Sequence, residues 1–242
     1  MKFLPGISAA VLVAAVAVSG CSNKPKDTFV PKPPEAVPPA TVTPGNEASL
    51  FPLDKGNQWT YTVQLLVKLK GQNQPPKTYQ TVWTVKESKP TPNGLEAVIE
   101  TTLPDNKTDK FKWRSNSKGI YELADGAVQF NPPLPVILFP VKEGSVFDWK
   151  GTGPNGTSTG GPQTSHRTVR ASEVVDTDMG QMSAIPVDDS GTVEAKGKTG
   201  NSLATDWFTP GVGIVRLRQE VVIGDQGYVL LLKLKSKSLM KS

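Results

Sequence analysis

The chain has 242 residues, of which 37% are hydrophobic, and its formal net charge is +5. This aliphatic and aromatic content is enough to build a core, which excludes a chain that is disordered throughout. Cys21 is the only cysteine and His166 the only histidine, so an intramolecular disulfide is excluded and a zinc or copper site lacks ligands.

Residues 1–20 have the layout of a secretory signal, with Lys2 at the positive start, an apolar stretch over 3–18, and small residues before a cleavage site. The segment ends at Cys21, and the tetrad Val18-Ser19-Gly20-Cys21 resembles the lipobox of bacterial lipoproteins. The resemblance implies that Cys21 is lipidated on sulfur, becomes the new N-terminus, and is acylated on its amine by chains such as palmitate. Two or more acyl chains anchor a protein stably, whereas one chain binds reversibly.

Two alternatives to the anchor remain open. The protein could be a plain secreted one with an incidental cysteine at the cut, or the segment could stay as an uncleaved helix, although Pro5 and Gly6 interrupt it. The residue after the cysteine is Ser22 rather than Asp, which favours the outer membrane if the cell is Gram-negative. We therefore expect a lipid-anchored protein of the bacterial cell envelope, facing the periplasm or the surface.

Residues 21–49 are predicted to form a linker that starts at the lipidated cysteine and is rich in proline. Such a segment populates polyproline II, so the roughly 27 residues from Ser22 to about Ala48, at about 3.1 Å each, reach at most about 80 Å. We interpret the segment as a spacer between membrane and domain, with a proline-recognition ligand as the alternative. Its prolines are Pro25, Pro31, Pro33, Pro34, Pro38, Pro39 and Pro44.

Residues 50–242 are predicted to form one β domain, because apolar residues alternate with polar ones almost throughout. Residues 59–70 are the longest example, with Trp59, Tyr61 and Val63 on one face and Thr60 and Thr62 on the other. Turn formers such as Asp125-Gly126 separate the candidates, which favours an antiparallel meander. The other predicted strands are 78–87, 95–103, 108–115, 119–124, 127–130, 145–150, 165–175, 181–187, 204–208, 214–223 and 228–236.

About a dozen strands cannot stay in one flat sheet, because twist accumulates and the edges must be protected. A strongly curved half-barrel, a closed barrel and a two-layer sandwich each satisfy this constraint, and the pattern alone does not choose between them. The apolar segment 132–140 is expected to cross the sheet opening, either to close the core or as a lid over a ligand.

Two motifs near the ends of the domain carry a family resemblance: residues 51–61, with Phe51-Pro52-Leu53 and Trp59-Thr60-Tyr61, and residues 207–215, from Trp207 to Val215. The pair resembles the TapB-like family of exported proteins of unknown activity. The resemblance implies a single strongly curved antiparallel sheet, a half-barrel like that of periplasmic lipoprotein carriers, and this is the fold class we expect. The motif residues, interpreted as architectural with ligand contact as the alternative, are Trp59, Tyr61, Trp207, Pro210, Gly211 and Gly213.

No catalytic motif survives its context. Residues 156–160 match the Gly-x-Ser-x-Gly pattern around Ser158, but Gly161 and Pro162 follow and no helix does. His166 lies on a predicted strand, and a triad would also need an acid behind it. Asp176 and Asp178 resemble only part of a calcium loop. We expect no enzyme activity, no cofactor and no metal.

The expected function is a non-enzymatic binding or scaffold module of the envelope. The alternative is a carrier or acceptor of lipid or another apolar ligand in the half-barrel, and a cell-envelope hydrolase is a distant third. The expected partners are the membrane, through the anchor, and an envelope protein, lipid or cell-wall component. Nucleic acid is not expected, because the cations are spread over an exported chain.

Overall fold

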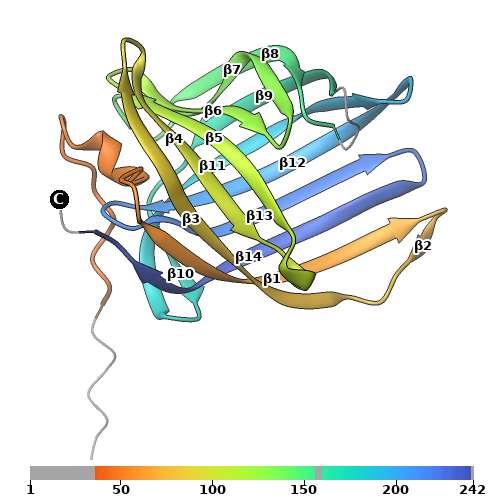
Figure 1. Cartoon of the computed structure of the whole chain (residues 1–242), viewed down its shortest axis with the longest axis horizontal. Coiled ribbons are helices and arrows are strands. Elements are labelled where there is room, and N and C mark those ends of the chain that lie inside the picture. Colours follow the sequence, from red (N-terminus) through yellow and green to blue (C-terminus); the bar gives the residue numbers. More distant parts are fainter. Residues whose placement is uncertain (1–35, 156–159, 241–242) are drawn as a thin grey trace, which may run out of the picture. The chain divides into compact units, whose positions relative to one another are not determined.

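The computed structural model describes residues 36–155 and 160–240, which are almost entirely β-strand (Figure 1). The compact unit runs over Val37–Ser242. Its elements in chain order are η1 (Glu47–Leu50), β1 (Gln58–Leu69), β2 (Gln72–Asn73), β3 (Lys77–Thr91), β4 (Gly94–Thr102), η2 (Pro104–Asn106), β5 (Thr108–Asn116), β6 (Gly119–Asp125), β7 (Val128–Leu138), β8 (Val146–Gly153), β9 (Gly161–Val169), β10 (Glu173–Thr177), β11 (Gly180–Ala195), β12 (Lys198–Thr209), β13 (Gly213–Ile223) and β14 (Gln226–Ser238).

All strand pairs are antiparallel, and most join neighbours in the chain, so the predicted all-β meander is confirmed. Two further pairings close the sheet: β14 lies against β1, and β11 pairs with β9 as well as β12. The result is a closed barrel of 12 strands, with β2 and β10 attached to it. The expected half-barrel is therefore wrong in detail, because a half-barrel and a closed barrel require the same alternation of side chains.

The first part of the unit lies before the predicted domain start at residue 50. Ala40 and Val42 pack against the core, and the Ala40 amide lies within hydrogen-bonding distance of the hydroxyls of Ser172 (2.8 Å) and Ser183 (2.5 Å). None of the helices in the described residues is long and apolar enough to span a membrane.

Aromatic side chains fill one end of the barrel, which we call the closed end. Leu50 ends η1 and Phe51 follows it, and both are fully buried together with Trp59 and Tyr61. The Phe51 ring packs on Trp59 at 5.3 Å and edge-on against Trp113 at 4.8 Å between centroids. The polar groups of Trp59 and Tyr61 are satisfied: Trp59 Nε1 donates to the Val212 carbonyl at 2.6 Å, and Tyr61 Oη donates to the Ile214 carbonyl at 2.9 Å.

The weakest junction of the barrel wall is the seam between β7 and β8. The two strands pair only at Asn131 and Thr152. The prolines of β7 lack the N–H that a ladder needs, which limits backbone pairing here. Side chains add to this junction: Trp149 Nε1 of β8 donates to the Pro132 carbonyl at 3.1 Å, and Arg167 Nη1 of the next strand, β9, donates to the Val136 carbonyl of β7 at 3.0 Å.

The segment 132–140 is consequently not a crossing loop or a lid. Residues up to Leu138 belong to β7 and form part of the barrel wall. Val136 and Ile137 are buried, with exposures of 2% and 0%. The segment therefore closes the core as a strand rather than as a loop.

We expect Gly213→Ala to destabilise the barrel more than Gly211→Ala, as measured by chemical denaturation. Both glycines have positive φ, so each alanine costs about 1 kcal/mol from the backbone. A Cβ at Gly213 would in addition lie 3.1 Å from the Phe51 ring and 3.2 Å from Trp59, whereas nothing lies within 4 Å at Gly211. The extra crowding should bring the Gly213→Ala loss to about 2–4 kcal/mol. Equal losses of the free energy of unfolding in the two variants would contradict tight packing of the Phe51 and Trp59 rings over Gly213.

Candidate functional site

The structure brings the two predicted motifs together at the closed end. Trp59 and Tyr61 from β1 donate to carbonyls of residues 212 and 214, and Gly213 lies directly under the Phe51 and Trp59 rings. The Gly211 amide donates to the Ser49 carbonyl at 2.9 Å, and the neighbouring Pro210 is half-buried. Every polar group of Trp59 and Tyr61 is thus engaged within the protein.

Trp207 lies apart from these residues. Its indole N–H donates to Glu173 Oε1 of β10 at 2.6 Å, and the Arg216 guanidinium stacks over its ring at 5.0 Å. Only 7% of Trp207 is exposed. Cys21 and Ser158, the predicted lipidation and rejected nucleophile positions, lie outside the described residues.

Burial falls steeply along the inward face of β1. Trp59 and Val63 near the closed end are buried at 0% and 2% exposure, Leu65 and Val67 are half-buried, and Leu69 is 47% exposed. The paired strand β14 shows the same change, from buried Leu232 and Leu234 to half-buried Leu230 and Tyr228. Solvent therefore reaches the barrel interior from the other end, which we call the open end.

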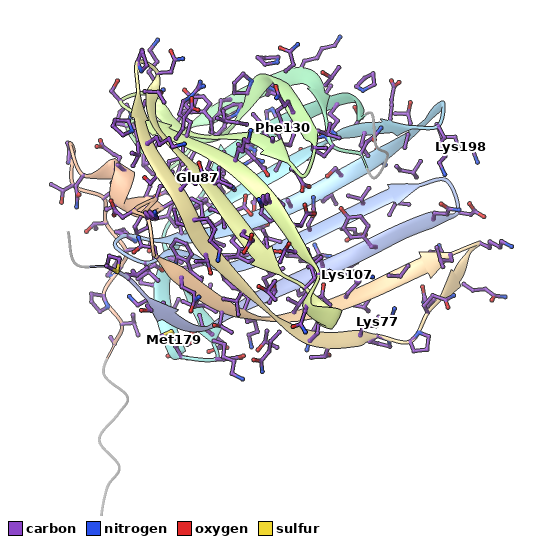
Figure 2. All side chains as sticks on the ribbon, viewed as in Figure 1. Lys77, Glu87, Lys107, Phe130, Met179 and Lys198 are labelled. Atoms are coloured by element: carbon purple, nitrogen blue, oxygen red, sulfur yellow. The ribbon has the colours of Figure 1, made fainter. Side chains whose placement is uncertain are left out.

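The open end is marked in Figure 2 by Lys77, Lys107 and Lys198. Register places the inward residues of β13 beside those of β14, and these too are half-buried. We call this accessible, mostly hydrophobic surface the apolar lining. Its apolar members are Leu65, Val67, Leu217, Val221, Ile223, Tyr228 and Leu230, and Gln219, which pairs with Leu230, is a polar member.

A buried polar cluster lies inside the barrel, centred on Arg167 of β9. Its side chain is 6% exposed, and Nη2 lies 3.0 Å from Asp189 Oδ2 while Nη1 lies 3.6 Å from Asp206 Oδ2. Ser165 Oγ donates to Asp189 Oδ1 at 2.7 Å. A single guanidinium therefore faces more than one carboxylate in a partly desolvated interior.

Glu122 of β6 adds another carboxyl to this cluster. Its pKa is raised to about 8, first by burial and then by the Asp125 charge, while the Arg167 charge lowers it by a smaller amount. Burial also raises the pKa of Asp206 to about 6, although Arg167 opposes this change. Sequence reasoning missed the cluster because its members are far apart in the chain and meet only when the barrel closes.

We expect Glu122→Gln to remove a pH dependence of stability between pH 6 and 8. The folded protein holds the Glu122 proton up to about pH 8, whereas the unfolded chain releases it near the ordinary value of 4.5, so the free energy of unfolding falls as pH rises between these values. Above pH 6 Asp206 has already ionised, which isolates Glu122. Denaturation at pH 6 and pH 8 should show the variant more stable than wild type at pH 8, by about 1 kcal/mol or more.

The control is Glu143→Gln, since Glu143 is exposed on a loop. It should keep the wild-type slope. A Glu122→Gln variant that also keeps this slope would contradict a proton held on Glu122.

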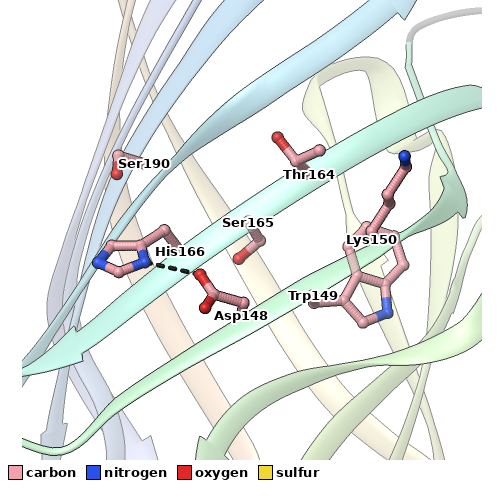
Figure 3. A pocket seen from close by; sticks show the side chains of 7 residues that line it. All are labelled: Asp148, Trp149, Lys150, Thr164, Ser165, His166 and Ser190. Atoms are coloured by element: carbon pink, nitrogen blue, oxygen red, sulfur yellow. Dashed lines mark hydrogen bonds and ion pairs between the residues drawn. The ribbon is translucent and has the colours of Figure 1, made fainter.

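An open pocket of about 470 Å³ lies on the barrel wall at β8, β9 and β11 (Figure 3). Asp148, His166 and Ser190 are direct cross-strand partners there. His166 Nδ1 lies 2.7 Å from Asp148 Oδ1. The acid that the sequence did not reveal behind His166 is therefore present, and Ser190 faces the same histidine from the opposite strand.

The array of Asp148, His166 and Ser190 has the acid and base that acyl transfer requires. It lacks a pair of hydrogen-bond donors for the oxyanion, which the reaction requires as well. Ser190 lies on β11, whose backbone is paired with β9 on one side and β12 on the other, so its neighbouring amides are committed to the ladders. The His166 and Asp148 side chains are 54% and 80% exposed, so water competes at the histidine. We interpret the array as a polar surface group.

Accordingly, the protein should hydrolyse p-nitrophenyl butyrate no faster than its His166→Ala and Ser190→Ala variants. The comparison uses equal concentrations at pH 8, where a histidine base would be neutral. A rate that falls at least tenfold in both variants would reinstate a hydrolase.

Comparisons with known proteins identify no family. No family model matches the chain, and no curated protein matches it. The TapB-like resemblance therefore stays a prediction.

Two solved structures are similar in fold. One is a protein from Bacteroides fragilis, described as exported and as having a YmcC-like fold, with 16% identity and a TM-score of 0.48. The other is a protein from Parabacteroides distasonis, described as a lipoprotein, with 15% identity and a TM-score of 0.44. Each likeness covers 78% of this chain and 98% of the other. Function must consequently be argued from the barrel itself.

Proposed function

We propose that the protein is a non-enzymatic binding module of the bacterial cell envelope, anchored through Cys21, which receives an apolar or amphipathic ligand through the open end of its barrel. The observation that carries this proposal is the loss of burial along the inward faces of β1 and β14. A barrel that served only as a scaffold has no need for accessible apolar side chains inside.

The apolar lining supplies the binding energy. Burying apolar surface yields roughly 25 cal/mol per Å², or about 0.8 kcal/mol for each CH₂ of a ligand chain. An acyl chain of about ten buried carbons would gain about 8 kcal/mol before the costs of association. Micromolar affinity corresponds to about 8 kcal/mol after these costs, so it requires a longer buried chain or polar contacts in addition.

Polar groups beside the lining favour an amphipathic ligand over a pure hydrocarbon. Asp125 of β6 and Tyr228 of β14 lie on different walls, and the Asp125 charge contributes to the raised pKa of Tyr228. Burial, followed by the Asp109 charge, raises the pKa of Asp125 to about 6. Hydrogen-bonding groups of a ligand could therefore meet carboxyl and hydroxyl groups next to the apolar surface.

The envelope location rests on the N-terminal sequence. The tetrad ending at Cys21 supports lipidation, and the proline-rich segment after it supports a tether. Ser22 supports the outer membrane in a Gram-negative cell. A tethered module would take up its ligand at a fixed place, unlike a soluble carrier.

Val67→Arg should weaken binding of a fluorescent fatty-acid analogue to residues 37–242 at least tenfold, because a guanidinium on the inward face of β1 introduces a charge into the apolar lining. The control is Gln64→Arg on the outward face of the same strand, which should bind like wild type. Native mass spectrometry of the wild-type unit should also detect co-purified lipid, and less of it in Val67→Arg.

The scaffold alternative predicts the opposite result in both measurements. Wild-type protein that is repeatedly empty and does not bind the analogue would leave only a surface role. Circular dichroism of both variants confirms that the fold is kept.

A further inference from the structure

The outward face of β12, β13, β14 and β1 exposes apolar side chains near the open end. Leu66, Leu203 and Val222 are 41%, 46% and 38% exposed. Val229 and Leu231 are half-buried between them. We call these five residues the outer patch.

Register makes the outer patch continuous. Leu66 pairs with Val229, Val229 pairs with Glu220, and Glu220 pairs with Leu203, so these residues form one row across four strands. Leu231 and Val222 lie in the rows on either side, within the distance over which diagonal side chains meet. The patch is a flat strip of sheet rather than a groove.

Cations surround this strip. Lys68, Lys233, Arg216 and Arg218 lie on the same outward face, in rows adjacent to the patch. The acid within it, Glu220, is paired with Arg218 at 2.8 Å. A second acid, Asp178, accepts from Thr62, which is the cross-strand partner of Lys233. The four cations outnumber these two acids, which suits an anionic interface.

The tether favours a lipid surface over a protein as the occupant. Between Cys21 and the first described residue, Ala36, the chain spans at most roughly 45 Å at about 3.1 Å per residue. The bilayer is then always within reach, and tethering raises its effective concentration at the barrel surface. Each Lys or Arg near an anionic membrane adds about 1 kcal/mol, and exposed leucines insert at the headgroup level.

We propose that the outer patch docks on the headgroup region of an anionic bilayer and thereby holds the open end of the barrel next to the membrane. The proposal rests on the proposed function, since it assumes the anchor and gives the open end a source of ligand. Leu66 and Val222 lie near the ends of β1 and β13 that form this open end.

The test uses mature lipidated protein in vesicles. Cys21 is the only cysteine and its sulfur carries lipid, so an introduced cysteine is the only free thiol. Leu203→Cys is labelled with an environment-sensitive fluorophore, and Lys112→Cys on the outward face of β5 is the control. In vesicles of phosphatidylcholine with phosphatidylglycerol, nitroxide lipids should quench the label at 203 at least threefold more than the label at 112.

The charge requirement has its own variant, Lys68→Glu with Lys233→Glu, made in the Leu203→Cys background. It should lower quenching at 203 at least threefold, as should vesicles of phosphatidylcholine alone. Equal quenching at 203 and 112 would overturn the proposal, and so would quenching at 203 that is the same with and without anionic lipid. Protection of the label at 203 by envelope protein in the absence of vesicles would also overturn it and indicate a protein partner.

The two proposals fail separately. Val67→Arg should weaken binding of the fatty-acid analogue at least tenfold while leaving the quenching difference intact. Loss of the quenching difference in a protein that still binds the analogue would reject docking alone.

Discussion

Closure of the sheet between β9 and β11 is the constraint on which the rest of the structure depends. β11 is long enough to pair with β10 over its first residues and with both β9 and β12 afterwards. Closure removes the open edges of a long meander and separates an inside from an outside. Arg167, Asp189 and Asp206 come together only because of it, and so does the distinction between the apolar lining and the outer patch.

The closed end shows how a barrel of this size is filled. The chain before β1 contributes Leu50 and Phe51 to this end as a plug, and both are fully buried in the same core as the strand side chains. The two motifs that the sequence made conspicuous are parts of this plug, because Trp59 and Tyr61 donate to the segment that contains Gly213. Their architectural interpretation accounts for the contacts that these residues make.

Much of the fold could be predicted from alternation alone. The row from Trp59 to Val63 is buried as expected, and Leu232 and Leu234 are buried where Lys235 and Lys237 are exposed. Closure of the curved sheet into a barrel could not be predicted, because strand pairing between distant segments leaves no local pattern. The interior cluster was invisible for the same reason, since Glu122, Arg167 and Asp206 each look like an ordinary polar residue in a strand. The acid behind His166 was missed because Asp148 becomes its neighbour only through the register of β8 and β9.

The seam between β7 and β8 is the line of the barrel wall with the fewest backbone pairs. A wall that is paired along its whole length can widen only by breaking many backbone hydrogen bonds at once. Here a single residue pair and the Trp149 indole join the two strands, so separation along this line would break the fewest contacts. Arg167 of β9 reaches the Val136 carbonyl of β7 and also faces the carboxylates of Asp189 and Asp206, so one guanidinium serves both the wall and the charged interior.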